Sequence, residues 1–178
     1  IEENRIMYYD DSSWGIRYGI LVDGTDSVNI VGNDLDGRNF GIAGQGIVCK
    51  NIVGWLSIHS NIVKNYRTYG IYTQGSDPGN NYRISNNQIE SIRDLGILYE
   101  GENGIFTKNT VNGVEAGSGI EIKGINGTIT ENRFLNIQAG TGIIVNGADN
   151  LIANNFIEAE GVGIAKGISL QENGSGSE

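Results

Sequence analysis

The chain has one cysteine, one proline and one histidine among its 178 residues, and these scarcities exclude several classes of protein. A single cysteine, Cys49, permits neither an internal disulfide framework nor a cysteine-based zinc site. The net charge of -9 leaves no excess of lysine and arginine to neutralise phosphates, so we expect no nucleic-acid partner. No apolar run reaches the length of a membrane span, so we expect no membrane partner either.

Glycine, in contrast, is in excess, with 28 residues, and much of it belongs to a repeat. Each copy has a glycine followed by isoleucine and a short apolar strand, and usually a second glycine five residues after the first. A repeat of this kind is typical of a solenoid. The copies are Gly19–Gly24, Gly41–Gly46, Gly70–Gly75, Gly96–Gly101, Gly119–Gly124, Gly142–Gly147 and a degenerate Gly167–Glu172.

A second motif, apolar-x-x-Asn-x-apolar, runs in phase with the glycine motif. Its asparagines are separated by 29, 28, 26, 22, 23 and 23 residues, so the later units converge on one length and the earlier ones carry insertions. The seven asparagines are Asn4, Asn33, Asn61, Asn87, Asn109, Asn132 and Asn155.

Apolar and polar residues alternate over short stretches within each unit, which indicates strands rather than helices. Three short strands per unit, separated by glycine and asparagine corners, predict an all-β fold: a parallel β-helix of about seven coils with 22–29 residues each. Isoleucine, valine and leucine at matching positions would stack inward, and the asparagines would form a hydrogen-bonded ladder at one corner. The alternative repeat fold, a leucine-rich horseshoe, requires Leu-x-x-Leu-x-Leu in each unit, and this pattern is missing.

The paired motifs resemble the repeats of the pectate-lyase-like parallel β-helix superfamily, and the resemblance extends from Ile1 to Leu170. It implies a right-handed, single-stranded β-helix domain over residues 1–172, followed by a linker-like tail at 173–178. The superfamily includes polysaccharide lyases, glycoside hydrolases, C5-epimerases and phage tailspikes, so it implies a polysaccharide partner and an extracellular, cell-surface or virion location. The motifs record stacking and not catalysis. Because the chain opens inside a repeat, we expect upstream sequence to be missing.

Insertions and aromatic residues gather in the N-terminal half. The long segments between motifs are Met7–Tyr18, Ile47–Ser57 and Ser76–Arg83, and twelve of the fourteen aromatic residues lie at or before Phe106. Insertions in a solenoid form surface loops, often on the binding side. We therefore expect a polysaccharide on the outer wall of these coils. The aromatics, alternatively, pack the loops onto the wall. Predicted substrate contacts are Trp55, Tyr72, Tyr99 and Gln74.

Strand alternation predicts which residues of the glycine motif point outward. The third positions are Leu21, Ala43, Tyr72, Leu98, Glu121 and Ile144, and the fifth positions are Asp23, Gln45, Gln74, Glu100, Lys123 and Asn146. Glu100 and Glu121 then fall on adjacent coils, as a pair of carboxylates for acid–base hydrolysis requires. Asp10, Asp11 and Asp23 are further acidic candidates. The competing interpretation is that an acidic protein scatters carboxylates over every solvated face.

Three arginines of the same half, Arg67, Arg83 and Arg93, are candidates to bind the carboxylate of an acidic sugar. They could instead pair with Asp77 and Asp94.

The remaining candidates for chemistry are weak. Tyr69–Gln74 lies on the frame of the mannuronan-epimerase motif but lacks its aspartate and histidine, so that chemistry is not predicted. The lone His59 is expected to be a wall residue. Asp34 and Asp36 share one face of a strand and form at most a weak Ca²⁺ site, so we expect no metal and no other cofactor.

The predicted function is a polysaccharide-binding or polysaccharide-degrading β-helix, with the enzyme a lyase or glycoside hydrolase. The alternative is a non-catalytic shaft or adhesin module, such as part of a tailspike. A tailspike-like protein would be a homotrimer. The uncapped core near Ile1 predicts end-to-end contact with another chain.

Overall fold

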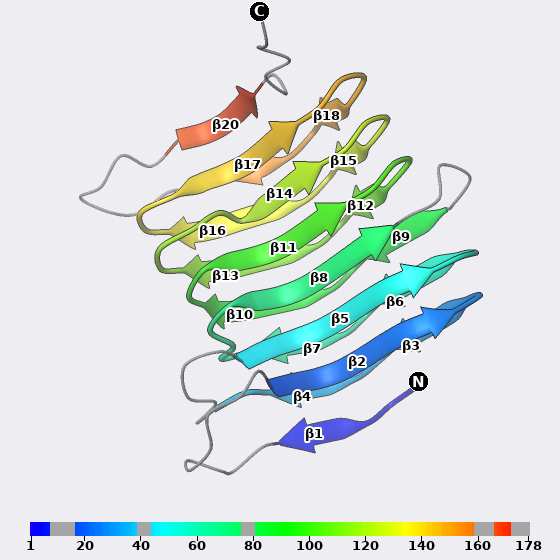
Figure 1. The fold of residues 1–178 in the computed structure, drawn as a ribbon. Helices are drawn as coiled ribbons and strands as arrows, with labels where there is room; N and C mark the ends of the chain where they lie inside the picture. The colour runs from blue at the N-terminus through cyan, green and yellow to red at the C-terminus, as the bar shows by residue number, and fades with distance from the viewer. Residues whose placement is uncertain (8–16, 39–43, 76–80, 159–165, 172–178) are drawn as a thin grey trace, which may run out of the picture.

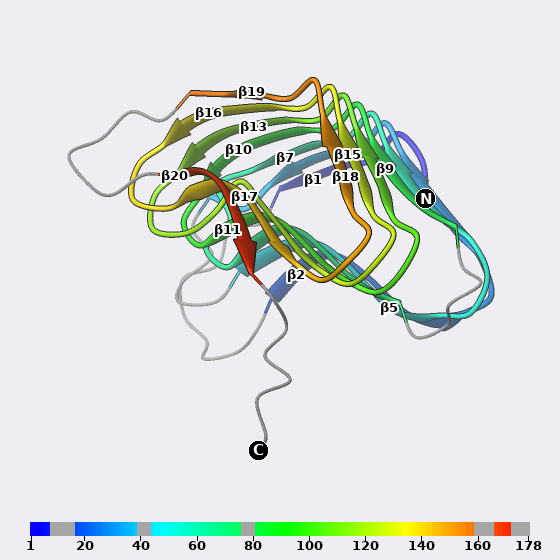
Figure 2. The same ribbon diagram turned by 90° about the horizontal axis from the view of Figure 1, so that it is seen from above.

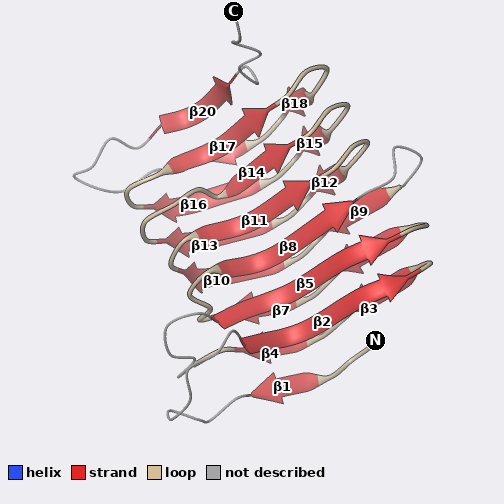
Figure 3. Cartoon of the chain, viewed as in Figure 1, coloured by secondary structure: helices blue, strands red, loops and turns tan. Residues whose placement is uncertain are grey.

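The computed structural model describes residues 1–7, 17–38, 44–75, 81–158 and 166–171. Over these residues the chain winds into a stack of coils built only of strands and turns (Figures 1 and 3). All strand pairs are parallel, and each strand pairs with its equivalents in the coils before and after it. The predicted parallel β-helix and its repeat are therefore confirmed.

Three sheets, here named A, B and C, form the sides of the stack, and the view along its axis shows each as one side of every coil (Figure 2). Sheet A consists of β3 (Val28–Val31), β6 (Leu56–His59), β9 (Tyr82–Ser85), β12 (Ile105–Thr107), β15 (Thr128–Thr130) and β18 (Leu151–Ala153). Sheet B consists of β1 (Arg5–Met7), β4 (Asp34–Asp36), β7 (Ile62–Lys64), β10 (Gln88–Ile92), β13 (Thr110–Val114), β16 (Arg133–Ile137) and β19 (Phe156–Ile157). Sheet C consists of β2 (Arg17–Thr25), β5 (Gly44–Ile52), β8 (Tyr69–Gly75), β11 (Leu95–Glu100), β14 (Ile120–Lys123), β17 (Thr141–Asn146) and β20 (Lys166–Gln171).

The core is a set of apolar columns that run along the stack. The isoleucine of each glycine motif faces inward and is paired with its equivalents in the adjacent coils. The apolar residues on either side of each ladder asparagine from Asn33 to Asn132 also face inward, including Ile84 and Ile89, which are fully buried. Because every coil shares its apolar contacts with two neighbours, the core is continuous rather than closed within one coil.

The predicted asparagine ladder runs the length of the corner between sheets A and B. The Nδ2 of each asparagine donates to Oδ1 of the asparagine in the following coil, at 2.9–3.0 Å in all six steps from Asn4 to Asn155. The backbone N–H donates to the same oxygen. Nδ2 of Asn87, for example, also reaches the carbonyl of Ile58 in the previous coil. The ladder thus satisfies polar groups that the buried corner would otherwise leave unpaired.

The first glycine of each motif is required by close packing. A Cβ at Gly70 would overlap the carbonyl oxygen of Gly96 in the next coil and Cγ2 of Ile89 in the facing sheet. The same two obstacles, the next glycine's carbonyl and an inward side chain of sheet B, recur at Gly96 and Gly119. The glycine column therefore marks the line where sheet C approaches sheet B most closely.

The structure corrects the predicted register of the second coil. Ile47 pairs with Ile20 and Ile71, so the copy begins at Gly46 and not at Gly41. The third and fifth positions of this coil are therefore Val48 and Lys50 instead of Ala43 and Gln45. Gln45 precedes the motif and pairs with Tyr69, and Ala43 lies outside the described residues.

The predicted loop at Ile47–Ser57 is also wrong in part. Most of it is the continuation of β5 to Ile52, and only residues 53–55 connect that strand to β6. The strands of sheet C are longer in the first two coils: β2 and β5 each have 9 residues, against 4 in β14. The corner between sheets C and A consequently projects further in the blue and cyan coils than in the later ones (Figure 2). Among the described residues, no helix has the length and apolar character needed to cross a membrane.

Candidate functional site

The outer face of sheet C carries a row of polar side chains that we call the sheet C stripe. Strand alternation places Ile97 and Tyr99 inward, and Leu98 and Glu100 outward, on β11. Register then aligns Glu100 with Gln74 and Lys123, and Leu98 with Tyr72 and Glu121. The stripe comprises Lys50, Tyr72, Glu100, Glu121, Lys123 and Asn146, from five consecutive strands of the sheet.

Glu100 is the centre of the stripe. Its Oε2 accepts a 2.7 Å hydrogen bond from the hydroxyl of Tyr72, and its Oε1 accepts one of 3.2 Å from Nζ of Lys123. Lys123 also lies 3.9 Å from Oε1 of Glu121, which in turn accepts a hydrogen bond from Nδ2 of Asn146. The predicted placement of Glu100 and Glu121 on adjacent coils is confirmed, and one ammonium lies between the two carboxylates.

Aromatic rings and a second ammonium extend the stripe toward the N-terminal coils. The Tyr72 ring lies 5.3 Å from that of Tyr69, and Nζ of Lys50 lies 5.3 Å from the centroid of the Tyr72 ring. A cation in this position is attracted by the ring face. Leu98 is 3 % exposed although it points outward between Tyr72 and Glu121, with which it pairs. The stripe is thus a packed, cross-linked surface.

Two groups of the stripe hold their protons firmly. Burial, together with the hydrogen bond to the Glu100 carboxylate, raises the pKa of Tyr72 well above its usual value. Burial alone would lower the pKa of Lys123, but Glu100 and Glu121 raise it above its usual value. Near neutral pH both groups are therefore hydrogen-bond donors and not bases.

The corner between sheets B and C holds a shallow groove of about 420 Å³, which we call the corner groove. It contains Arg67 and Arg93, and the Nε of Arg67 is buried without a hydrogen bond among the described residues. Nε of Arg93 lies 3.8 Å from Oδ1 of Asp94, in agreement with the alternative that this arginine pairs with a carboxylate of the protein. The groove is lined by Asn65, Tyr66, Arg67, Ser91, Arg93 and Glu115.

Several predicted site residues lie away from both features. Tyr99 is completely buried, packs against Phe106 with ring centroids 5.1 Å apart and donates to the carbonyl of Glu102, so its predicted place on the outer wall is wrong. Trp55 is exposed on the corner after β5, and Arg83 points outward from sheet A. Gln74 faces outward beside Glu100.

The acidic candidates other than Glu100 and Glu121 do not belong to the stripe. Asp23 is exposed on β2 and accepts a 2.7 Å hydrogen bond from Nδ2 of Asn51. Asp10, Asp11 and Asp77 lie outside the described residues, as do most of the residues in the predicted loops at Met7–Tyr18 and Ser76–Arg83. The lone His59 lies on the outer side of sheet A, where its ring contacts Ser60.

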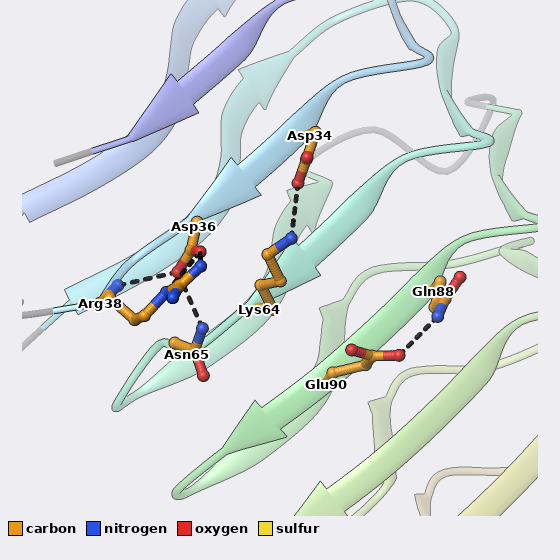
Figure 4. Close-up of polar contacts among 7 residues, drawn as sticks. All are labelled: Asp34, Asp36, Arg38, Lys64, Asn65, Gln88 and Glu90. Atoms are coloured by element: carbon orange, nitrogen blue, oxygen red, sulfur yellow. Dashed lines mark hydrogen bonds and ion pairs between the residues drawn. The ribbon is translucent and has the colours of Figure 1, made fainter.

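The Asp34 and Asp36 pair on sheet B faces outward on one strand, as predicted, but each carboxylate is engaged by protein cations or amides (Figure 4). Asp34 pairs with Lys64 at 3.1 Å, and Asp36 accepts hydrogen bonds from Nε of Arg38 and Nδ2 of Asn65. Burial alone would raise the pKa of Asp36, but these hydrogen bonds lower it to about 2. Among the described residues there is no cluster of three or more His, Cys, Asp or Glu that could hold a metal ion.

Comparison with known families agrees with this architecture. The profile of a family described as a right handed beta helix region matches residues 76–177, more than half of the chain. The chain belongs to the right-handed β-helix family. No curated protein and no solved structure matches it. Membership in the right-handed β-helix family accounts for the coils. It does not specify the chemistry of the outer wall, which depends on the side chains there.

The sequence did not single out Lys123 or Lys50 as site residues. Lys123 is predicted only as one member of the outward fifth column. Lys50 is missed because the predicted second copy begins at Gly41, which places Gln45 instead of Lys50 at the fifth position. The corrected register finds Lys50, because it places this residue at the outward fifth position of its coil, paired with Asp23.

Proposed function

We propose that this right-handed β-helix protein binds a polysaccharide along the sheet C stripe. The observation that carries the proposal is the contact of Tyr72 and Lys123 with the same carboxylate, Glu100, from the coils on either side. This contact holds donors and acceptors at the strand spacing of the sheet, about 4.8 Å, along the axis of the solenoid. An extended sugar chain presents hydroxyls at regular intervals and is suited to such a row.

The side chains of the stripe favour recognition over bond cleavage. A general acid must give a proton, yet both oxygens of Glu100 act as acceptors here. A lyase needs a base, yet Tyr72 and Lys123 have raised pKa values and retain their protons. Binding without turnover is therefore the form of the proposal that the geometry supports best.

The corner groove supplies a second contact for the same ligand. Arg67 begins the segment that leads into β8, and Tyr69 and Tyr72 follow on that strand. The groove and the stripe thus adjoin. The Nε of Arg67 is buried and makes no hydrogen bond within the described part of the chain, so it is a donor that an acidic group on a sugar would satisfy.

A non-catalytic shaft is the second candidate function. It is favoured by the mutual pairing of the stripe's charges, since Lys123 and Glu100 already satisfy one another in the free protein. In that case the hydrogen bonds between coils serve only to stiffen the stack.

Affinity electrophoresis in gels that contain dextran, alginate or polygalacturonate tests the proposal. We expect the wild-type protein to be retarded by at least one of these polysaccharides, and the Tyr72→Ala/Lys123→Ala variant to lose most of the retardation. The matched control is Ser57→Ala/Thr130→Ala, which alters the outer face of sheet A. Release of reducing ends or of unsaturated ends would show turnover and would establish a degrading enzyme instead. Equal migration of all three proteins in every gel would favour the shaft.

A further inference from the structure

The corner groove contains two arginines from one column of the solenoid. The backbone N–H groups of Arg93 and Asp94 donate to the carbonyls of Tyr66 and Arg67, at 3.2 and 3.1 Å. Arg67 and Arg93 therefore occupy equivalent positions in consecutive coils, and their backbones lie one strand spacing, about 4.8 Å, apart. Two like charges in adjacent positions repel each other, and an anion between them would offset the repulsion.

Protein carboxylates satisfy these two arginines only in part. The Nε of Arg67 is buried without a hydrogen bond, and its guanidinium forms no ion pair with a carboxylate of the described residues. Arg93 and Asp94 are both nearly half exposed, so their 3.8 Å contact is weak. A buried charged donor without an acceptor is costly, and an acceptor from outside the chain would stabilise it.

The other polar side chains of the groove indicate the shape of that acceptor. Asn65 lines the groove, but its Nδ2 is engaged by Asp36 (Figure 4). Ser91 lines it as well, and no other described residue engages its hydroxyl. A carboxylate has two oxygens, which one guanidinium already occupies. Donors from two arginines and a hydroxyl are better matched by the larger number of oxygens on a phosphate or sulfate.

The charges around the groove make any binding of an anion a local effect. Glu115 is the carboxylate that lines the groove, and it follows Arg93 in the same column, because its N–H donates to the carbonyl of Ile92. Its charge opposes a bound anion. The net charge of -9 also excludes a general attraction for anions. Hydrogen bonds from the guanidinium groups must therefore provide the affinity.

We propose that the corner groove binds one tetrahedral oxyanion, a sulfate or a phosphate, between the guanidinium groups of Arg67 and Arg93. Arg67 donates through its buried Nε, and Ser91 donates its hydroxyl. The anion is either a free ion or an ester on a sugar, since both present the same oxygens. The inference goes beyond the proposed function, because a free ion can occupy the groove whether or not the sheet C stripe binds a polysaccharide.

NMR titration of the 178-residue chain with sodium sulfate tests the site directly. The Nε–Hε resonance of Arg67 reports on its hydrogen bonding, and sodium chloride at equal ionic strength is the control. We expect a saturable shift with half-saturation on the order of 1 mM for sulfate and no saturation with chloride. A shift that rises linearly with sulfate, or one that chloride reproduces, would overturn the proposal.

Sodium acetate tests the tetrahedral shape of the ligand. Its planar carboxylate engages one guanidinium, so we expect it to bind at least about fivefold more weakly than sulfate. Equal affinities for acetate and sulfate would contradict the assignment to a tetrahedral oxyanion.

Two variants with opposite effects separate anion binding from a loss of fold, and the backbone N–H resonances of Ser91 and Arg93 follow these titrations. Arg67→Lys keeps the charge and removes the Nε donor, so we expect the sulfate affinity to fall at least about tenfold. Glu115→Gln removes the opposing carboxylate, so we expect the affinity to rise about threefold. Arg83→Lys, on the outer face of sheet A, is the matched control and should bind as the wild type does. Unchanged affinity in Arg67→Lys, or weaker binding in Glu115→Gln, would refute an anion in this groove.

Glucose 6-sulfate, titrated in parallel with inorganic sulfate, separates the two sources of the anion. An affinity at least about threefold higher for the ester would identify a group carried by a sugar, and an equal or lower affinity would identify the free ion. Saturable sulfate binding by a protein that no polysaccharide retards would support this inference and contradict the proposed function. Retardation by a polysaccharide without a saturable sulfate shift would do the reverse.

Discussion

Tyr72 and Glu100 lie on adjacent coils of sheet C, and the Tyr72 hydroxyl donates a 2.7 Å hydrogen bond to Oε2 of Glu100. The bond joins two strands on their outer side, where the backbone ladder alone would suffice to hold them. With Lys123 on the next coil it forms a chain of contacts across β8, β11 and β14. The outer wall of this solenoid is therefore ordered by side chains as well as by the backbone.

The asparagine ladder predicts a large loss of stability when one rung is removed. In Asn87→Ala, the backbone N–H and Nδ2 of Asn61 lose their acceptor and the carbonyl of Ile58 loses its donor, all in a buried corner. We expect the free energy of unfolding to fall by about 3 kcal/mol in urea titrations. Asn126→Gly, at an exposed residue with φ of 58°, is the control and should change it by less than about 1 kcal/mol. Equal effects of the two changes would show that the ladder contributes little.

The glycine column predicts a sharp contrast between two glycine-to-alanine changes. In Gly96→Ala the new methyl overlaps the carbonyl of Gly119 and Cγ1 of Val111, and we expect a loss of about 3 kcal/mol. In Gly167→Ala the methyl meets no atom of the described residues within 4 Å, and we expect the stability to be unchanged or slightly raised. Thermal unfolding of both variants measures the contrast. A Gly96→Ala protein as stable as the wild type would disprove the close approach of the sheets.

Thr73 occupies a core position with a hydroxyl that has no partner. It is fully buried, and its Oγ1 makes no hydrogen bond among the described residues. Thr73→Val keeps the shape and removes the unsatisfied hydroxyl, so we expect the free energy of unfolding to rise by about 1 kcal/mol. Thr128→Val, on the outer side of sheet A, is the control and should change it little. Destabilisation by Thr73→Val would indicate a partner for the hydroxyl.

Asp36 predicts a loss of stability in acid. Its pKa is about 2 in the folded protein and 3.8 in a free side chain, so the unfolded state binds the proton more tightly. The contribution of Asp36 is therefore complete above about pH 4 and is lost as the pH falls through about 2, and it amounts to about 2 kcal/mol. Urea titrations between these pH values should show a steeper decline for the wild type than for Asp36→Asn. Parallel declines would remove Asp36 as the cause.

The repeat made the fold predictable, because the spacing of glycine and asparagine reflects stacking that recurs in every coil. The register of the second coil was not predictable, since Gly41-Ile42 and Gly46-Ile47 both fit the motif and only pairing with Ile20 and Ile71 selects the second. Alternation alone places Tyr99 inward, as in the structure. A surface position was predicted for it as a residue with a polar hydroxyl. The sequence does not show that the backbone carbonyl of Glu102 accepts the hydrogen bond of this hydroxyl inside the coil. The adjacency of Glu100 and Glu121 followed from the repeat. The position of Lys123 between them depends on side-chain conformation, which the repeat does not specify.

The central claim is that the sheet C stripe binds a polysaccharide, and calorimetric titration of Tyr72 variants tests it most directly. The titrant is whichever of dextran, alginate or polygalacturonate retards the wild type. We expect Tyr72→Ala to weaken binding by about tenfold or more, which corresponds to about 1.4 kcal/mol, and Thr130→Ala on sheet A to bind as the wild type does. Wild-type affinity in Tyr72→Ala, with its fold intact by circular dichroism, would contradict the claim.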